Sequence, residues 1–114
     1  PAEEDPMEPH DAWADDLRLA EAVERLEAPL DISVQRLERT WGGLRTFAPD
    51  GLPVVGFDPE AEGFFWLAGQ GGYGIQTSPA LSRVAAALVA GGGIPDDIAA
   101  EGIDAQAISP SRFR

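Results

Sequence analysis

Two features of this sequence have the residue types and spacing to do chemistry: a glycine-rich loop and an arginine. Gly69, Gly71 and Gly74 fit the pattern G-x-G-x-x-G, which lies between an apolar run and a helical pattern. Such a loop lets the backbone approach a ligand closely, and the N–H groups that start the next helix favour negative charge. Arg45 lies in residues 32–48, which carry three arginines and one glutamate in a chain of net charge −12. Its guanidinium can bind a carboxylate through two hydrogen bonds.

Read literally, the glycine pattern would bind a dinucleotide, with Asp96 or Asp97 on the ribose. We reject this interpretation because residues 91–95 (GGGIP), which precede those aspartates, cannot form a second parallel strand. The helix is also expected to begin near Ser78, with Pro79 at its first position, and not at the third glycine. The 40 residues that follow the pattern are too few for the rest of a doubly wound sheet. A tight turn that binds nothing is the alternative.

The composition excludes several classes of function. With 20 acidic and 8 basic residues, the chain offers no basic face for nucleic acid or an anionic membrane. It has no cysteine and one histidine, so we expect no disulfide, no cysteine nucleophile and no metal site. No apolar stretch is long enough to span a bilayer, and the acidic start does not resemble a signal peptide. A cytoplasmic protein is therefore expected.

The elements of the first half must place Arg45. Apolar residues at helical spacing predict an amphipathic helix over residues 12–27, with Asp11 as its N-cap. Residues 32–48 are rich in β-branched and aromatic residues and predict one long strand or two. Within them, the pair Gly42-Gly43 indicates a bulge or a close backbone approach.

The elements of the second half must place the glycine loop. A turn signal at residues 50–51 is followed by a predicted short strand at 53–55, and the apolar run at 64–68 predicts a buried strand. The glycine-rich turn at 69–74 leads to a predicted helix that three consecutive glycines end. Residues 94–114 are predicted to be loop with one helical turn.

Two longer stretches resemble a known family. Residues 41–56 (WGGLRTFAPDGLPVVG) and 63–80 (GFFWLAGQGGYGIQTSPA) closely resemble the C-terminal part of FAD-dependent D-amino-acid dehydrogenases and oxidases. This family includes glycine- and sarcosine-oxidase relatives, and the likeness is nearest to its D-arginine-dehydrogenase-like members. The resemblance covers residues 33–90, and the ending at 109–114 (SPSRFR) also fits. Residues 1–31 resemble the family's last substrate-domain helix more loosely.

The resemblance implies an α+β fold that is the C-terminal fragment of a two-domain FAD-dependent oxidoreductase. Residues 1–56 would end the mixed sheet of the substrate-binding domain, with a helix at 12–27 and strands within 32–56. Residues 57–114 would supply the closing strand, glycine loop and helix of the FAD domain. The FAD-binding half would belong to the same parent chain or to a separate subunit. The isolated chain is then expected to be inactive and to hold no FAD.

The resemblance also implies roles for single residues. The parent enzyme would oxidise the Cα–N bond of an amino acid, expected to be a D-amino acid, by hydride transfer to FAD. Arg45 would hold the substrate carboxylate, the Gly72 carbonyl would face the substrate amine, and Gln76 would contact substrate or flavin. No general acid or base is expected in this segment, and Trp41 and Trp66 are expected in the core. The residues implied to line the pyrimidine end of the flavin are Gly71, Gly72, Tyr73, Gly74, Ile75, Gln76 and Thr77.

A different class of function stays open beside this one. The first residue is a proline, so the chain is expected to have been trimmed, processed or cut from something longer. The chain could then be a non-catalytic remnant, or an interaction module or subunit, that kept the motifs without the FAD-binding half. The presence or absence of bound flavin separates these alternatives.

Overall fold

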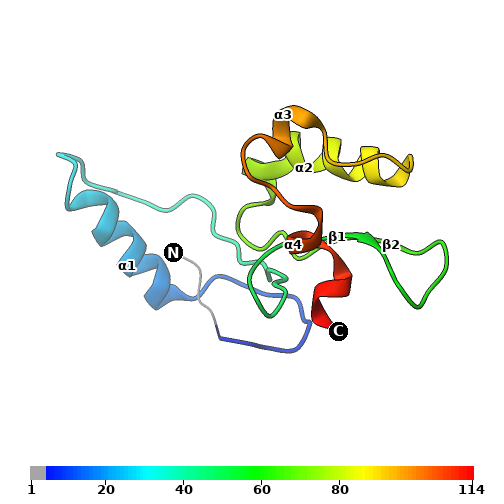
Figure 1. The fold of residues 1–114 in the computed structure, drawn as a ribbon. Helices are drawn as coiled ribbons and strands as arrows, with labels where there is room; N and C mark the ends of the chain where they lie inside the picture. Colours follow the sequence, from blue (N-terminus) through cyan, green and yellow to red (C-terminus); the bar gives the residue numbers. More distant parts are fainter. Residues whose placement is uncertain (1–4) are drawn as a thin grey trace. The chain divides into compact units, whose positions relative to one another are not determined.

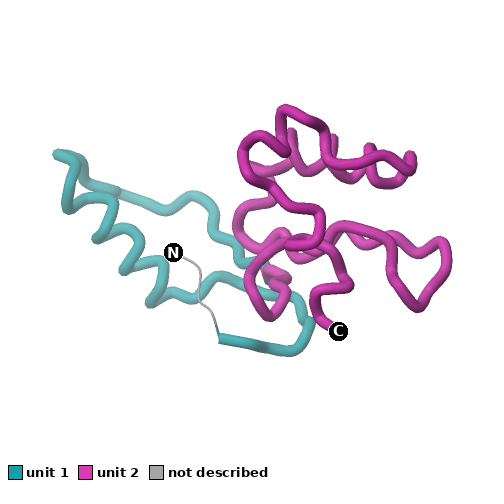
Figure 2. The backbone as a smooth tube through the Cα atoms, viewed as in Figure 1, with its two compact units in different colours: residues 1–44 teal, residues 45–114 magenta. Residues whose placement is uncertain are grey.

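The computed structural model describes residues 5–114, and the chain divides into two compact units, residues 1–44 and 45–114 (Figure 2). Residues 1–56 are expected to form the last part of the substrate-binding domain, and the first four of them lie outside the described residues. Within the described part, the chain is a small α+β structure, and no helix there has the length and apolarity needed to cross a bilayer. In chain order (Figure 1), the elements are α1 (Asp16–Glu27), β1 (Val54–Phe57), β2 (Phe65–Ala68), α2 (Gly74–Val89), α3 (Asp96–Ala99), α4 (Ala105–Ile108) and the 3-10 helix η1 (Pro110–Phe113).

The first unit contains helix α1. It begins at Asp16, and its N-cap is Asp15, whose carboxylate accepts a hydrogen bond from the backbone N–H of Arg18 at 3.0 Å. The predicted start at residue 12 with Asp11 as N-cap is therefore wrong, because a later acid satisfies the first-turn N–H groups. The end of the helix agrees with the prediction. No residue of α1 is buried: Leu17 and Leu26 are exposed, and Leu19 and Val23 are half-buried within the described part of this unit.

The prediction of strands over residues 32–48 is wrong. This stretch is extended but forms no strand, apart from one isolated bridge described below. Its alternation of apolar and polar residues is imperfect, and a strand needs a partner in the sheet. Gly42 does mark a close backbone approach, since a Cβ there would lie 2.6 Å from the carbonyl oxygen of Trp13. Trp41, expected in the core, is 81% exposed.

The second unit is built on a β-hairpin. β1 and β2 pair antiparallel with Val54 opposite Ala68, and both predicted strands of this region are confirmed to within two residues. Val55 of β1 is fully buried. The prediction that the second strand is buried is wrong, because Trp66 and Leu67 are exposed to solvent over more than a third of their surface. A sheet of two strands leaves part of its surface without a covering layer among the described residues.

The core of the second unit is small. Helix α2 packs its apolar side against β1, and the short helices α3 and α4 complete the cluster (Figure 1). Val84 and Ala85 at the centre of α2 are buried, whereas Val89 at its end is exposed. The buried residues are Val55, Val84, Ala85, Ile98 and Ile108.

Helix α2 begins at Gly74, the third glycine of the pattern, and contains Pro79. The predicted start near Ser78 is therefore wrong. Proline has no N–H to donate to the carbonyl of Ile75 one turn earlier. The hydroxyl of Ser78 donates to that carbonyl instead, at 2.9 Å. A side-chain hydroxyl thus replaces the lost backbone donor, and the helix continues through the proline.

The end of the chain has more helix than predicted. Residues 94–114 form α3, α4 and η1, so the prediction of a loop with one helical turn is wrong. Asp104 and Ser109 cap α4 and η1 through their side chains. Asp96 and Asp97 lie in α3 and not on a strand, which agrees with the rejection of a dinucleotide fingerprint. One reason for that rejection, the late helix start, does not hold.

An ion pair ties η1 to the turn before β1. Arg112 donates from Nε to one carboxylate oxygen of Asp50 at 2.6 Å and from Nη2 to the other at 3.0 Å. The predicted turn is confirmed, with the Gly51 N–H donating to the carbonyl of Ala48 at 2.9 Å. The Arg112 side chain is only 12% exposed, whereas that of Asp50 is 36% exposed, so the arginine alone is shielded more than in an ordinary surface salt bridge.

This pair predicts a pH dependence of stability. The Arg112 hydrogen bond lowers the pKa of Asp50 from 3.8 to about 2. Because the folded pKa is depressed, ionised Asp50 stabilises the fold above pH 3.8, and that contribution is lost as the pH falls toward 2. Thermal unfolding of the wild type and Asp50→Asn between pH 7 and 2 checks this. We expect the stability difference between them to shrink across that acidic window; a difference that stays constant to pH 2 would contradict the assignment.

Candidate functional site

Arg45 lies against the glycine loop. A Cβ added to Gly72 would stand 2.9 Å from Nη1 and 3.4 Å from Cζ of Arg45. Two residues to which the family resemblance gives substrate-binding roles are therefore brought together, although 26 residues separate them in the chain. Arg45 is exposed, and no carboxylate among the described residues pairs with it. Its guanidinium is thus available to an anionic group from outside this segment.

Backbone pairing holds the segment that carries Arg45. The N–H of Gly71 donates to the carbonyl of Thr46 at 3.0 Å, and Phe47 forms an antiparallel bridge with Gln70. The Phe47 ring covers Gly71, where an added Cβ would lie 2.4 Å from a ring carbon. No role for Phe47 was predicted from the sequence. A signal for it existed, because Phe47 stands two residues after Arg45 on extended chain, where alternate residues share a side.

The local structure of the loop also explains why some of its positions are glycine. Gly71 has a φ of 53°, in the left-handed region that favours glycine, and Phe47 fills the space beside it. Gly72 leaves room for the Arg45 guanidinium. The loop closes with a hydrogen bond from the Tyr73 N–H to the carbonyl of Gln70 at 3.0 Å. The tight turn weighed as an alternative is therefore present, and one of its glycines directly adjoins the arginine.

The loop delivers the chain into an exposed helix N-terminus. Tyr73 occupies the N-cap position of α2, and its side chain makes no capping hydrogen bond. Ile75 is 95% exposed, and Gln76 and Thr77 are exposed as well. The hydroxyl of Thr77 donates to the carbonyl of Tyr73 at 2.9 Å, so it supports the first turn of the helix. The N-cap residue thus gives the first N–H groups of α2 no side-chain hydrogen bond, and the residues around them are exposed.

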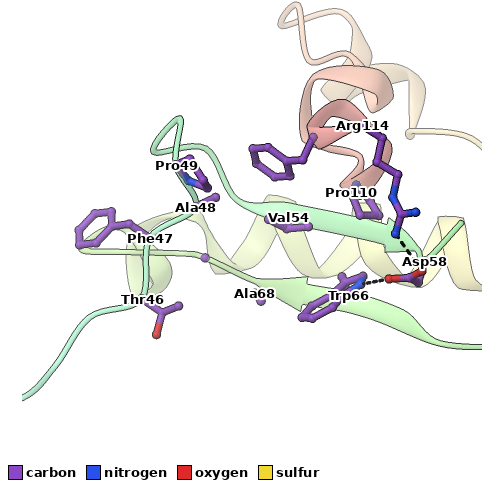
Figure 3. Close-up of a pocket in the computed structure, with 12 residues that line it drawn as sticks. Thr46, Phe47, Ala48, Pro49, Val54, Asp58, Trp66, Ala68, Pro110 and Arg114 are labelled. Carbon is purple, nitrogen blue, oxygen red and sulfur yellow. Dashed lines mark hydrogen bonds and ion pairs between the residues drawn. The ribbon is translucent and has the colours of Figure 1, made fainter. Parts of the chain in front are cut away.

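A separate apolar groove lies on the second unit (Figure 3). Its volume is about 550 Å³, and neither Arg45 nor Gly72 lines it. At one end the indole N–H of Trp66 donates to Asp58 at 2.8 Å, and Arg114 approaches the same carboxylate at 3.7 Å. The Trp66 hydrogen bond and the Arg114 charge lower the pKa of Asp58. The residues that line the groove are Thr46, Phe47, Ala48, Pro49, Val54, Asp58, Trp66, Ala68, Gly69, Pro110, Phe113 and Arg114.

Comparison with known proteins identifies the family. Residues 2–88 match the family model described as FAD dependent oxidoreductase, known as DAO. The chain belongs to this family. The family is described as FAD-dependent, which agrees with the cofactor expected from the sequence for a parent enzyme. The finer assignment, to D-amino-acid dehydrogenases, goes beyond this match.

Part of the chain is also similar to a curated protein. Hydrogen cyanide synthase subunit HcnC from Pseudomonas aeruginosa is 41% identical over 63 residues. The matched region is 55% of this chain and 15% of that protein. The chain therefore spans only a small part of the length of this relative.

The residues at the start of α2 fit the cofactor of the DAO family. The pyrimidine end of a flavin carries oxygen and nitrogen acceptors and gains negative charge on reduction. Uncapped N–H groups and the positive end of the helix dipole suit such acceptors. The glycines before them let a planar ring approach the backbone, and Tyr73 and Ile75 present exposed apolar surface beside it. Within the described residues, no group of three acidic or histidine side chains could hold a metal ion.

Proposed function

We propose that this chain is the C-terminal segment of an FAD-dependent enzyme that oxidises the Cα–N bond of an amino acid, most specifically a D-amino acid. The observation that carries the proposal is the Arg45 guanidinium lying against Gly72, immediately before the uncapped start of α2. In the reaction, the Cα–H bond breaks with hydride transfer, the Cα–N bond becomes an imine, and the amine loses a proton. Water then converts the imine to a keto acid and ammonia. When bound, FAD supplies the hydride acceptor.

The chain's own residues bind and orient in this proposal. Arg45 binds the substrate carboxylate through its two-pronged guanidinium. The carbonyl of Gly72 accepts a hydrogen bond from the substrate amine, which fixes the Cα–H bond relative to the acceptor. Gln76 contacts the substrate or the flavin edge. No residue of this segment is assigned as an acid or a base, because orientation of a deprotonated amine is the contribution required.

The residues at the start of α2 hold the flavin in the same proposal. Their N–H groups face the pyrimidine end, where the helix dipole favours the negative charge that reduction brings. Ile75 and Tyr73 cover the ring edge with side chains that are exposed in this segment. The full set of flavin contacts proposed is Gly71, Gly72, Tyr73, Gly74, Ile75, Gln76 and Thr77.

The proposed partner is the FAD-binding part of the same enzyme. The chain spans 15% of the relative HcnC, and α1 buries none of its residues, so a larger structure would cover its apolar side. Residues 1–56 would then belong to the substrate domain and residues 57–114 to the FAD domain. The parts could be one chain or two, since HcnC is named as a subunit. A cytoplasmic location belongs to the same proposal.

A flavin spectrum tests this function. We expect the purified parent flavoenzyme, meaning the complete protein that contains this segment, to hold FAD and to reduce a redox dye when D-amino acids are added. The isolated 114-residue chain is expected to hold no flavin, because the proposal assigns most of the FAD contacts to the other part. A parent without flavin would contradict the proposal. An isolated chain that holds FAD and reduces the dye would contradict the assignment as a segment.

A separate measurement addresses the number of chains. If the FAD-binding part is a separate subunit, native mass spectrometry of the purified protein shows a stable heteromer. A single species whose mass equals one longer chain shows that the two parts are continuous. The non-catalytic alternative predicts neither flavin nor dye reduction in either preparation.

A further inference from the structure

Arg112 is held by several contacts at once. Its guanidinium makes four hydrogen bonds: two to the carboxylate of Asp50, one to the carbonyl of Leu52 at 2.9 Å and one to the carbonyl of Ser109 at 3.0 Å. Its Cζ atom also lies 4.2 Å from the centre of the Phe113 ring. These contacts connect residues about 60 positions apart in the chain, and they leave the side chain 12% exposed.

The other two-pronged arginine pair of this unit provides a contrast. Arg83 donates to both carboxylate oxygens of Asp97 at 2.7 and 2.8 Å. That arginine is 54% exposed, and its pair joins α2 to α3, away from the glycine loop. The Arg83–Asp97 pair therefore has the same chemistry as the Arg112–Asp50 pair but does not touch the segment that carries Arg45, so we expect it to affect stability and not substrate binding.

The turn that Arg112 holds is directly connected to Arg45. Asp50 also accepts the backbone N–H of Leu52 at 3.1 Å, so the arginine and the turn share one carboxylate. Before the turn, residues 46–48 run beside the glycine loop, with the carbonyl of Thr46 accepting from Gly71 at 3.0 Å. Residues 45–50 thus form a short segment that begins with Arg45 and ends at the Asp50 turn. The glycine loop holds its beginning through Thr46, and Arg112 holds its end through Asp50.

We infer that Arg112 is a positioning residue for substrate binding, acting through the Asp50 turn to keep the Arg45 guanidinium against Gly72. The inference rests on the proposed function, in which Arg45 holds the carboxylate. A displacement of about 1 Å in a positioning group can cost up to 10²-fold in rate or affinity. Loss of the Arg112 anchor frees the turn and lets residues 45–49 move away from the loop. The carboxylate contact then weakens while the flavin contacts of α2 stay in place.

The test uses the FAD-loaded parent flavoenzyme and its Arg112→Gln, Arg112→Lys and Asp50→Asn variants. We expect the KM for the amino acid to rise by about 5- to 30-fold in Arg112→Gln, with kcat within about twofold of wild type. The dissociation constant of benzoate, a carboxylate probe measured through the flavin absorption spectrum, should rise in parallel, and FAD content should not fall. Arg112→Lys, which keeps one charged donor, should be intermediate. If Arg112→Gln does not fold, Arg112→Lys and Asp50→Asn carry the same comparison.

A double variant and a matched control test whether the rise in KM of Arg112→Gln acts through Arg45. If Arg112 acts through Arg45, Arg45→Ala/Arg112→Gln has the same KM as Arg45→Ala. Arg83→Gln should leave KM and benzoate binding at wild-type values. The inference is overturned if the Arg112 and Asp50 variants lower only thermal stability, or if Arg112→Gln raises KM equally with and without Arg45. If Arg45→Ala itself leaves KM unchanged, the proposed function fails; if it raises KM and the Arg112 variants do not, this inference alone fails.

Discussion

Replacing Arg45 with alanine in the parent flavoenzyme is expected to lower kcat/KM for amino acids by about 10²- to 10⁴-fold, mainly through KM. A charge-assisted hydrogen bond is worth about 1.5–3 kcal/mol, and the guanidinium makes two of them with a carboxylate. Each 1.4 kcal/mol corresponds to about tenfold in affinity, so losing both gives this range. Steady-state kinetics on FAD-loaded protein provides the measurement.

Two controls make the Arg45 result specific. Arg39→Ala removes another exposed arginine of the same basic stretch and is expected to leave KM unchanged. An amine that lacks the carboxylate should bind equally weakly to the wild type and to Arg45→Ala. An unchanged KM for amino acids in Arg45→Ala, with FAD retained, would refute the assignment of Arg45 to the carboxylate.

Replacing Gly71 with alanine is expected to destabilise the second unit by about 2–5 kcal/mol. The backbone there has a φ of 53°, which costs about 1–2 kcal/mol for a residue with a Cβ. The new methyl group would also lie 2.4 Å from the Phe47 ring, and overpacking of this kind costs about 1–3 kcal/mol. Because the loop orients the start of α2, we expect FAD content of the parent to fall as well. Denaturant unfolding and flavin absorbance measure the two effects.

The chain offers a matched control for Gly71. An added Cβ at Gly93 meets no atom within 4 Å, and this glycine does not have a positive φ, so Gly93→Ala should be nearly neutral. Adding Phe47→Ala to Gly71→Ala removes the steric clash but not the backbone cost, and should recover part of the FAD content. A Gly71→Ala variant as stable as Gly93→Ala would show that the loop does not require a glycine there.

The sequence predicted the glycine loop and its neighbours well, because each signal is local. The turn before β1, the hairpin strands and the end of α2 all follow from glycines and short apolar runs. The assignment of Arg45 and Gly72 to the same substrate came from the family resemblance and not from spacing, since the two residues are far apart in the chain. The structure places them together.

The wrong predictions share a physical cause, which is that the deciding partner is not visible in the local pattern. The start of α2 was placed too late because Pro79 usually opens a helix, whereas the hydroxyl of Ser78 replaces its missing donor. Residues 32–48 have the composition of a strand but find no neighbouring strand to pair with in the described chain. Arg112 donates hydrogen bonds to Asp50, which lies 62 positions earlier in the chain, and the local sequence pattern cannot predict a contact between residues so far apart.

Anaerobic reduction of the bound flavin tests the central proposal most directly. Parent flavoenzyme is mixed without oxygen with a series of D-amino acids and with the corresponding amines that lack the carboxylate, while the absorption of oxidised flavin is followed. We predict that a D-amino acid bleaches the flavin, that the matched amine does so far less readily, and that Arg45→Ala removes the difference. A flavin that stays oxidised with every amino acid, or that the amine bleaches equally well, would contradict the proposal.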